Sequence, residues 1–137
     1  MSKITAAQAL QLAKDYNESS NAIGDFRLKN WDKLSAEERL VLGKTGRALL
    51  DQSQDLITYA VGKILDDTQA SLNDIRKATA DANQTIKTIN DIKKVISIGA
   101  ALVTLAAAIY TENPSGIASA LKGLISAVDA GSSSDSS

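Results

Sequence analysis

Cysteine and histidine are both absent from the 137 residues of this sequence. Without cysteine the chain forms no disulfide bond and performs no thiol chemistry, and its redox compartment stays undetermined. Without histidine it lacks the commonest metal ligand and the usual general base near neutral pH. A Ser-His-Asp or Cys-His catalytic centre is therefore excluded. We expect a protein that is not an enzyme and that uses no cofactor and no metal.

The chain also lacks an excess of charge of either sign. Fifteen basic and sixteen acidic residues leave a formal net charge of −1. Such a mixed surface does not attract phosphate backbones, so we expect no nucleic-acid partner. The first residues, Met-Ser-Lys-Ile-Thr-Ala, show no positively charged stretch followed by an apolar core, so a secretory signal is not indicated. The default localisation is cytoplasmic, with signal-less export and peripheral membrane association as alternatives.

Proline and aromatic residues are scarce, whereas apolar residues are not. The chain has one proline and 4% aromatic residues, but 44% of it is apolar. This composition is typical of helix bundles, and the length suits one domain with its own core. We predict an all-α fold over residues 1–130, an elongated helical bundle with a long heptad-patterned helix and a C-terminal hydrophobic helical hairpin. Residues 131–137, rich in serine, are predicted to be a disordered tail.

Two pairs of residues with capping-box spacing predict where helices begin. Thr5 and Gln8 form the first pair, and Ser35 and Glu38 form the second. In a capping box each side chain accepts a hydrogen bond from a backbone N–H group that the helix start leaves unpaired. We therefore predict a first helix over residues 5–22 and the start of another at residue 36.

The segment between these helices, residues 23–34, is predicted to be a connector. It carries Trp31, the only tryptophan of the chain. Aromatic side chains dominate the energetics of protein interfaces, so one interpretation of Trp31 is an anchor for a partner. The commoner alternative is a side chain that holds the connector on the chain's own core.

A long helical stem is predicted over residues 36–94. Proline is absent until Pro114, and only a few glycines interrupt the segment, so breaks near residues 43–46, Gly62 or Gly99 are the alternatives to one continuous helix. A heptad pattern runs through Leu65, Thr68, Leu72, Ile75, Thr79, Ala82, Ile86 and Ile89. This spacing predicts packing with a shallow left-handed crossing, on the chain itself or on another chain. The candidate packing residues are Leu65, Leu72, Ile75, Ile86 and Ile89.

The C-terminal part of the chain is almost free of charge. Residues 95–110 contain no charged side chain, and Asn113 and Pro114 then mark the end of one helix and the start of the next. We predict two helices, over residues 95–111 and 114–130, that form a hydrophobic hairpin.

Each of these two helices has a stripe of small residues opposite a broad apolar face. The small residues are Ala100, Thr104 and Ala108 in the first helix and Ser119, Gly123 and Ala127 in the second. The apolar faces consist of Ile98, Leu102, Leu105 and Ile109, followed by Ile117, Leu121, Leu124, Ile125 and Val128. Because small residues let backbones approach closely, we predict that the two small stripes meet. The apolar faces would then point outward, toward the stem, another subunit or lipid.

Two functions remain open for this arrangement. The first is a non-catalytic interaction or assembly protein that binds a protein partner or itself, as a homo-oligomer, through the heptad stem and the apolar hairpin. The alternative is a membrane-active protein that inserts residues 95–128, although a 16-residue uncharged stretch spans only about 24 Å of a bilayer core of about 30 Å. In this respect the architecture of residues 56–130 resembles that of α-helical pore-forming toxins, whose soluble forms hide such a hairpin.

Overall fold

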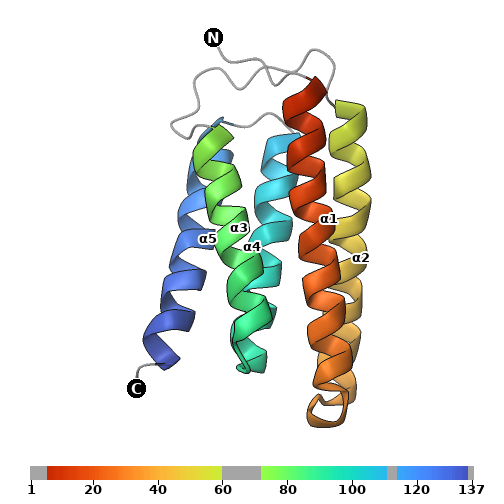
Figure 1. Cartoon of the computed structure of the whole chain (residues 1–137). Helices are drawn as coiled ribbons and strands as arrows, with labels where there is room; N and C mark the ends of the chain where they lie inside the picture. Colours follow the sequence, from red (N-terminus) through yellow and green to blue (C-terminus); the bar gives the residue numbers. More distant parts are fainter. Residues whose placement is uncertain (1–5, 60–71, 111–113, 136–137) are drawn as a thin grey trace.

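The computed structural model describes residues 6–59, 72–110 and 114–135, and all of its regular elements are helices (Figure 1). In chain order these are α1 (Ala6–Lys29), the short 3-10 helix η1 (Trp31–Lys33), α2 (Ala36–Tyr59), α3 (Leu72–Thr88), α4 (Ile92–Tyr110) and α5 (Pro114–Asp135). Successive α-helices run in opposite directions (Figure 1). The predicted all-α, bundle-like fold is confirmed in this general form.

The helices enclose one core. α1 packs against α2 and α3, and α4 packs against α2 and α5. α5 also lies against α3, so it covers the side of the bundle that α3 and α4 form. The largest fully buried side chains are Leu12, Tyr16, Ile23, Leu42, Leu49, Ile75, Ile86, Ile98, Leu102, Leu105 and Ile109. Burying each large aliphatic side chain contributes about 1.5–3 kcal/mol, so residues from α1 to α4 stabilise the bundle together.

The predicted connector over residues 23–34 is largely helical. α1 continues to Lys29, because Ile23 and Phe26 extend its buried stripe at helical spacing. The connection to α2 is then short and consists of η1 and its flanking residues. The second predicted capping box is confirmed, since the N–H of Ser35 donates to Glu38 Oε1 (2.8 Å) and the N–H of Glu38 donates to Ser35 Oγ (3.1 Å).

The predicted stem over residues 36–94 is not one helix. α2 ends at Tyr59, α3 begins at Leu72, and a further break separates Thr88 from Ile92. Asp91 explains this second break, because its Oδ1 accepts a hydrogen bond from the N–H of Lys94 (3.2 Å) and thereby caps α4. Of the glycines considered as break points, Gly62 lies outside the described residues.

The other candidate glycines lie inside unbroken helices. Gly43 and Gly46 belong to α2, where the Ser20 hydroxyl donates to the Gly46 carbonyl oxygen across the α1–α2 contact (2.7 Å). Gly99 belongs to α4, and a Cβ atom at this position would lie 2.8 Å from Thr45 Cγ2 of α2. Because Gly99 has no side chain, α4 can approach α2 closely at this position.

The C-terminal bounds also differ from the prediction. α5 begins at Pro114 as predicted, but it continues to Asp135, so residues 131–135 are helical rather than a disordered tail. The first predicted capping residue, Thr5, and the predicted cap of α5, Asn113, lie outside the described residues.

Candidate functional site

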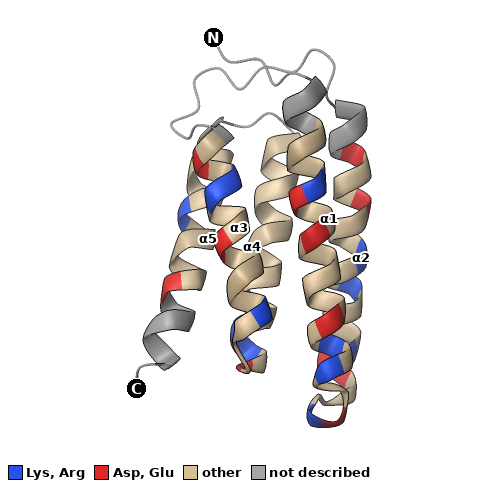
Figure 2. Cartoon of the chain, in the orientation of Figure 1, with Lys and Arg blue, Asp and Glu red and all other residues tan. Residues whose placement is uncertain are grey.

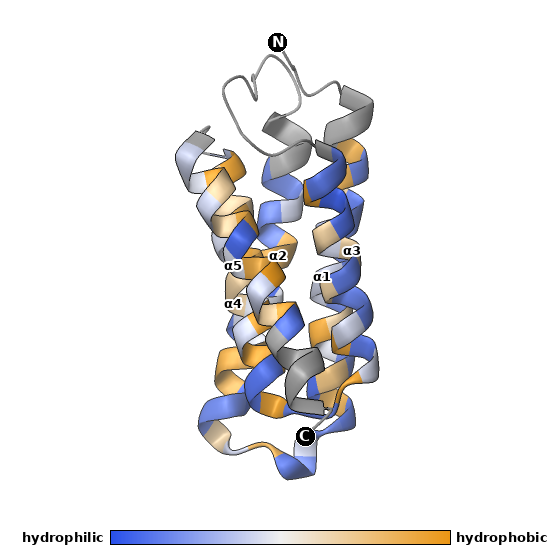
Figure 3. Ribbon diagram, turned by 90° about the vertical axis from the view of Figure 1, so that its left-hand side faces the viewer, coloured by the Kyte–Doolittle hydropathy of each residue, from blue (hydrophilic) through white to orange (hydrophobic). Residues whose placement is uncertain are grey.

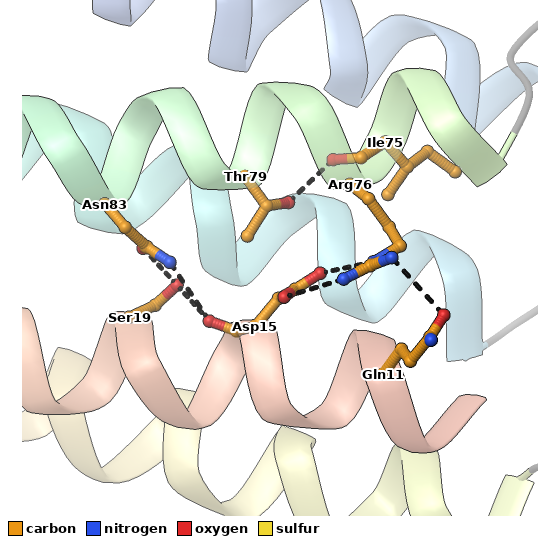
Figure 4. Close-up of polar contacts among 7 residues, drawn as sticks. All are labelled: Gln11, Asp15, Ser19, Ile75, Arg76, Thr79 and Asn83. Carbon is orange, nitrogen blue, oxygen red and sulfur yellow. Dashed lines mark hydrogen bonds and ion pairs between the residues drawn. The ribbon is translucent and has the colours of Figure 1, made fainter. Parts of the chain in front are cut away.

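Several polar side chains of α1 and α3 contact one another across the interface between the two helices (Figure 4). Arg76 donates from Nε to Asp15 Oδ2 (2.8 Å) and from Nη1 to Gln11 Oε1 (3.3 Å). The hydrogen bond with Asp15 raises the pKa of Arg76 above its usual value. Deeper in the interface, Ser19 Oγ lies 2.5 Å from Asn83 Oδ1, and Asn83 Nδ2 donates to the Asp15 carbonyl oxygen (3.1 Å).

Tyr16 lies next to these contacts and is fully buried. Burial raises the pKa of its hydroxyl group, so the group stays protonated at any physiological pH. The Thr79 hydroxyl donates to the Ile75 carbonyl oxygen (2.8 Å), and Tyr16 Oη has no hydrogen-bond partner within the described part of the chain. Apart from Tyr16 Oη, these polar groups pair with each other or with the backbone and do not converge on an open space. We interpret the α1–α3 interface as one that sets the register of the two helices.

Trp31 is held by arginines at the turn between α1 and α2. Its ring stacks against the guanidinium groups of Arg27 and Arg39, which lie 4.9 and 4.3 Å from the ring centroid. Arg39 also donates from Nε and Nη2 to the Trp31 carbonyl oxygen (2.9 and 2.6 Å). The ring remains 39% exposed, so Trp31 joins the turn to α2 through arginine contacts and not by insertion into the core.

The described heptad residues lie inside the bundle. Ile75, Ile86 and Ile89 are buried in the core of this chain. Leu72 is the first residue of α3, and Leu65 lies outside the described residues. The three buried isoleucines are covered by the chain's own helices, so they offer no surface to a second chain.

The predicted meeting of the two small-residue stripes is wrong. α4 and α5 do pack against each other, but most of the stripe residues lie on the surface. Ala100, Thr104, Ser119 and Gly123 are exposed, and a Cβ atom added to Gly123 would meet nothing within 4 Å. The remaining two predicted stripe residues, Ala108 and Ala127, are half-buried.

The apolar faces of the hairpin point into the bundle, toward the helices of the predicted stem, which is one of the predicted alternatives. The buried residues are Ile98, Leu102, Leu105, Ile109, Ile117, Leu121 and Leu124. Val128 is half-buried and packs against the core, whereas Ile125 remains 45% exposed. The physical reason is the larger free energy gained by removing broad aliphatic side chains from water, compared with alanine, serine or glycine. The helical spacing distinguishes the two faces, but it does not say which of them points inward.

This orientation leaves the small residues of both helices on the surface, where α4 is uncharged beyond its first turn and α5 also exposes Lys122 between Ser119 and Ser126. On α4 these small residues are Ser97, Ala100, Thr104 and Ala107. On α5 they are Ser119, Gly123 and Ser126. We call this set the α4–α5 outer face. Figure 2 shows α4 without charged residues beyond its first turn, while α1, α2 and α3 carry charges along their lengths. Figure 3 shows that α4 and α5 are richer in apolar residues than α1 and α3.

The outer face is bordered by apolar residues and also carries three exposed serines, Ser97, Ser119 and Ser126. Ile96 and Val103 flank the exposed residues of α4 and are only partly buried. The Thr104 hydroxyl donates to the Ala100 carbonyl oxygen within the helix (3.0 Å), so this polar group is satisfied without water. The sequence prediction did not single out Ala107 and Ser126. The signal that identifies Ala107 is its spacing of three residues from Thr104, which continues the exposed row.

Comparison with protein-family models, with curated proteins and with solved structures gives no match. Within residues 6–59, 72–110 and 114–135, no group of three or more acidic side chains could hold a metal ion. The candidate site is therefore argued from the surface of this chain alone, and it is the α4–α5 outer face.

Proposed function

We propose that this chain is a non-catalytic assembly protein whose α4–α5 outer face binds a helix of a protein partner or of another copy. One observation carries the proposal: α4 exposes a continuous row of uncharged residues from Ser97 to Ala107. A surface helix ordinarily presents charged or polar residues on the side opposite the core. In a chain with 23% charged residues, a charge-free exposed row on α4 favours contact with another protein surface.

The size of the exposed side chains favours a helix as the occupant. Alanine, serine and threonine project little beyond the backbone, so a second helix can approach α4 at the short end of the usual interaxial range of about 8–10 Å. The half-buried Ile96 and Val103 would then lose their remaining exposure. Burial of this apolar area stabilises the complex by roughly 25 cal/mol per Å² before the entropic cost of association.

A charge placed in the middle of the outer face tests this function. The variant Ala100→Glu would bury an unpaired carboxylate in the contact, so we expect association to weaken at least tenfold, which corresponds to about 1.4 kcal/mol. The matched control is Ala80→Glu, because Ala80 is an exposed alanine of α3. Sedimentation velocity for self-association and pull-down for a partner give the readouts. Equal association of the two variants, with equal thermal stability, would contradict the proposal.

Membrane activity is the second candidate, and α4 is the observation that favours it. Ile92–Tyr110 is the one helix of the described chain that is long and apolar enough to cross a membrane. Nineteen residues give about 28 Å at about 1.5 Å per residue, close to the hydrocarbon thickness. Insertion would require α4 to leave the core, since Ile98, Leu102 and Leu105 are buried there.

Liposomes loaded with a fluorescent dye test the membrane function. A membrane-active chain is expected to release the dye and to float with the vesicles, because the apolar face of α4 would enter the bilayer. Both signals should be measured at neutral and mildly acidic pH, with vesicles that contain anionic lipid and vesicles that do not. If neither leakage nor flotation occurs under any of these conditions, the second candidate is rejected.

A further inference from the structure

We propose that a hollow between α1 and α2 binds a small polyol phosphate, with the phosphate on two arginines and the hydroxyl groups beside a carboxylate. The hollow measures about 340 Å³, within the range of about 300–1,000 Å³ that is typical of small-molecule pockets. The lining residues that carry the proposal are Gly24, Arg27, Gly43, Gly46, Arg47 and Asp51. None of them belongs to the α4–α5 outer face, so this inference is independent of the proposed function.

Glycines make room for the hollow. A Cβ atom at Gly24 would meet nothing within 4 Å, and the nearest atom to a Cβ atom at Gly46 would be Ile23 Cγ2, at 3.7 Å. The packing of α1 against α2 therefore tolerates a side chain at either position, in contrast to Gly99 of α4. Glycine is less favourable than alanine inside a helix, so helix stability does not account for these residues either. The consequence of the missing side chains is open space beside the two helices.

Arg27 supplies fixed hydrogen-bond donors at one end of the hollow. Its Nε donates to the Arg39 carbonyl oxygen (2.8 Å), and its guanidinium group stacks on the Trp31 ring, 4.9 Å from the centroid. The same group lies over Gly43, where a Cβ atom would be 3.4 Å from Cζ and from Nη2. Within the described part of the chain, the two Nη groups of Arg27 have no acceptor. These donors are held in place before a ligand arrives, which lowers the entropic cost of binding.

Arg47 supplies a second positive charge. It follows Gly43 by four residues on α2, about 6 Å along the helix axis, and it lines the same hollow. Within the described residues, its side chain makes no ion pair and no hydrogen bond. Two guanidinium groups suit a phosphate monoester, which carries a charge of about −1.5 to −2 near neutral pH and accepts charge-assisted hydrogen bonds from both. A carboxylate would neutralise only one of the two charges.

Asp51 determines what can follow the phosphate. It lies four residues beyond Arg47, about 6 Å further along α2, and it lines the other end of the hollow. A carboxylate at this place repels a second phosphate, but it accepts hydrogen bonds from hydroxyl groups. The order of charges along α2 therefore favours one phosphate joined to a short carbon chain with free hydroxyl groups. A phospholipid, whose glycerol hydroxyl groups are esterified, offers Asp51 no donor.

Titration with glycerol 3-phosphate tests the site, with NMR spectra of the isotope-labelled chain as the readout. We expect saturable shifts of the backbone amide signals of Gly43 and Gly46, because both residues line the hollow. The variant Arg47→Gln should bind roughly tenfold more weakly or worse, since it loses one of two charged donors. The matched control is Lys44→Gln, which removes the same charge from an exposed residue of α2 outside the hollow. No saturable shift, or equal affinity of the two variants, would overturn the inference.

A side chain at position 24 tests the hollow itself. Gly24→Leu should fill the space and abolish the shifts, while thermal stability stays equal or rises, because leucine favours the helix over glycine. The control is Gly123→Leu on α5, where a Cβ atom also meets nothing within 4 Å. A folded Gly24→Leu variant that binds as tightly as the natural chain would overturn the inference.

Two further probes test the class of ligand. Inorganic phosphate should bind more weakly than glycerol 3-phosphate, and Asp51→Ala should remove the difference, because only the polyol offers hydroxyl groups to the carboxylate. Equal binding of both probes by the natural chain would indicate an adventitious anion site only and overturn the assignment. Vesicles that contain phosphatidic acid should not carry the chain in a flotation assay. Flotation that Arg47→Gln abolishes and Lys44→Gln does not would assign the hollow to a lipid head group and overturn the proposal of a free polyol phosphate.

Discussion

At the scale of single residues, two glycines show how differently the same amino acid is used in α4 and α5. A Cβ atom at Gly99 would lie 2.8 Å from Thr45 Cγ2 and 3.3 Å from Ile23 Cδ1. Thr45 has little freedom to move, because its hydroxyl donates to the Val41 carbonyl oxygen (2.9 Å). At Gly123 a Cβ atom would meet nothing within 4 Å. Gly99 is therefore required by packing, while Gly123 is not.

This contrast predicts opposite effects of one substitution. Gly123→Ala should stabilise the chain by about 1 kcal/mol, because alanine favours the helix by that amount. Gly99→Ala gains the same helix propensity but must displace Thr45, and overpacking of this kind costs about 1–3 kcal/mol, so the net change should be destabilising. Urea unfolding, followed by circular dichroism, measures both changes. A Gly99→Ala variant as stable as Gly123→Ala would show that α4 does not approach α2 as described.

At the scale of helices, the contact between α1 and α3 combines two ion pairs of unequal exposure. In the pair Asp15–Arg76 the side chains are 18% and 37% exposed, and their nearest atoms are 2.8 Å apart. In the pair Glu18–Lys87 they are 53% and 46% exposed at 2.5 Å. Solvent screens the second pair more strongly, and both long side chains lose rotamer freedom when they pair. Ranking by distance therefore gives the opposite order to ranking by exposure.

Double-mutant cycles should reveal the difference. We expect a coupling free energy of about 0.5–1 kcal/mol between Asp15 and Arg76 when each is replaced by alanine, since this pair is partly shielded and shares the interface with Ser19 and Asn83. The cycle for Glu18 and Lys87 serves as the matched control and should give a value near zero. Chemical unfolding of the single and double variants provides the measurement. A larger coupling for the exposed pair would contradict the ranking by exposure.

Helix positions in this chain could be predicted where a local chemical signal exists. Two predicted helix starts agree with the structure. One is marked by the capping box of Ser35 and Glu38, and the other by Pro114. The break at Asp91 also has a local cause, a carboxylate that caps α4, but a heptad pattern that includes Ile89 conceals it. Propensity alone favoured a break at Gly43 or Gly46, and packing of α2 against α1 keeps the helix intact there.

At the scale of the whole molecule, the orientation of the hairpin could not be predicted from its own residues. The periodicity identifies an apolar face with Ile98 and Leu102 and a small face with Ala100 and Thr104, and both faces fit a helix contact. Which face points inward depends on what the rest of the chain offers. Here α2 and α3 supply apolar surfaces, with Leu49 and Ile86 among their buried residues. The apolar face of the hairpin is therefore buried inside the bundle. The small face, with Ala100 and Thr104, remains exposed on the surface.

The most direct test of assembly through this face is the mass of the chain in solution. Under the proposed function, self-association through this face predicts that sedimentation equilibrium shows the natural chain at twice its 14.4 kDa mass. The Ala100→Glu variant should sediment as a monomer, and the Ala80→Glu control should behave like the natural chain. If Ala100→Glu leaves the mass unchanged from that of the natural chain, the outer face of α4 and α5 is not where this protein associates.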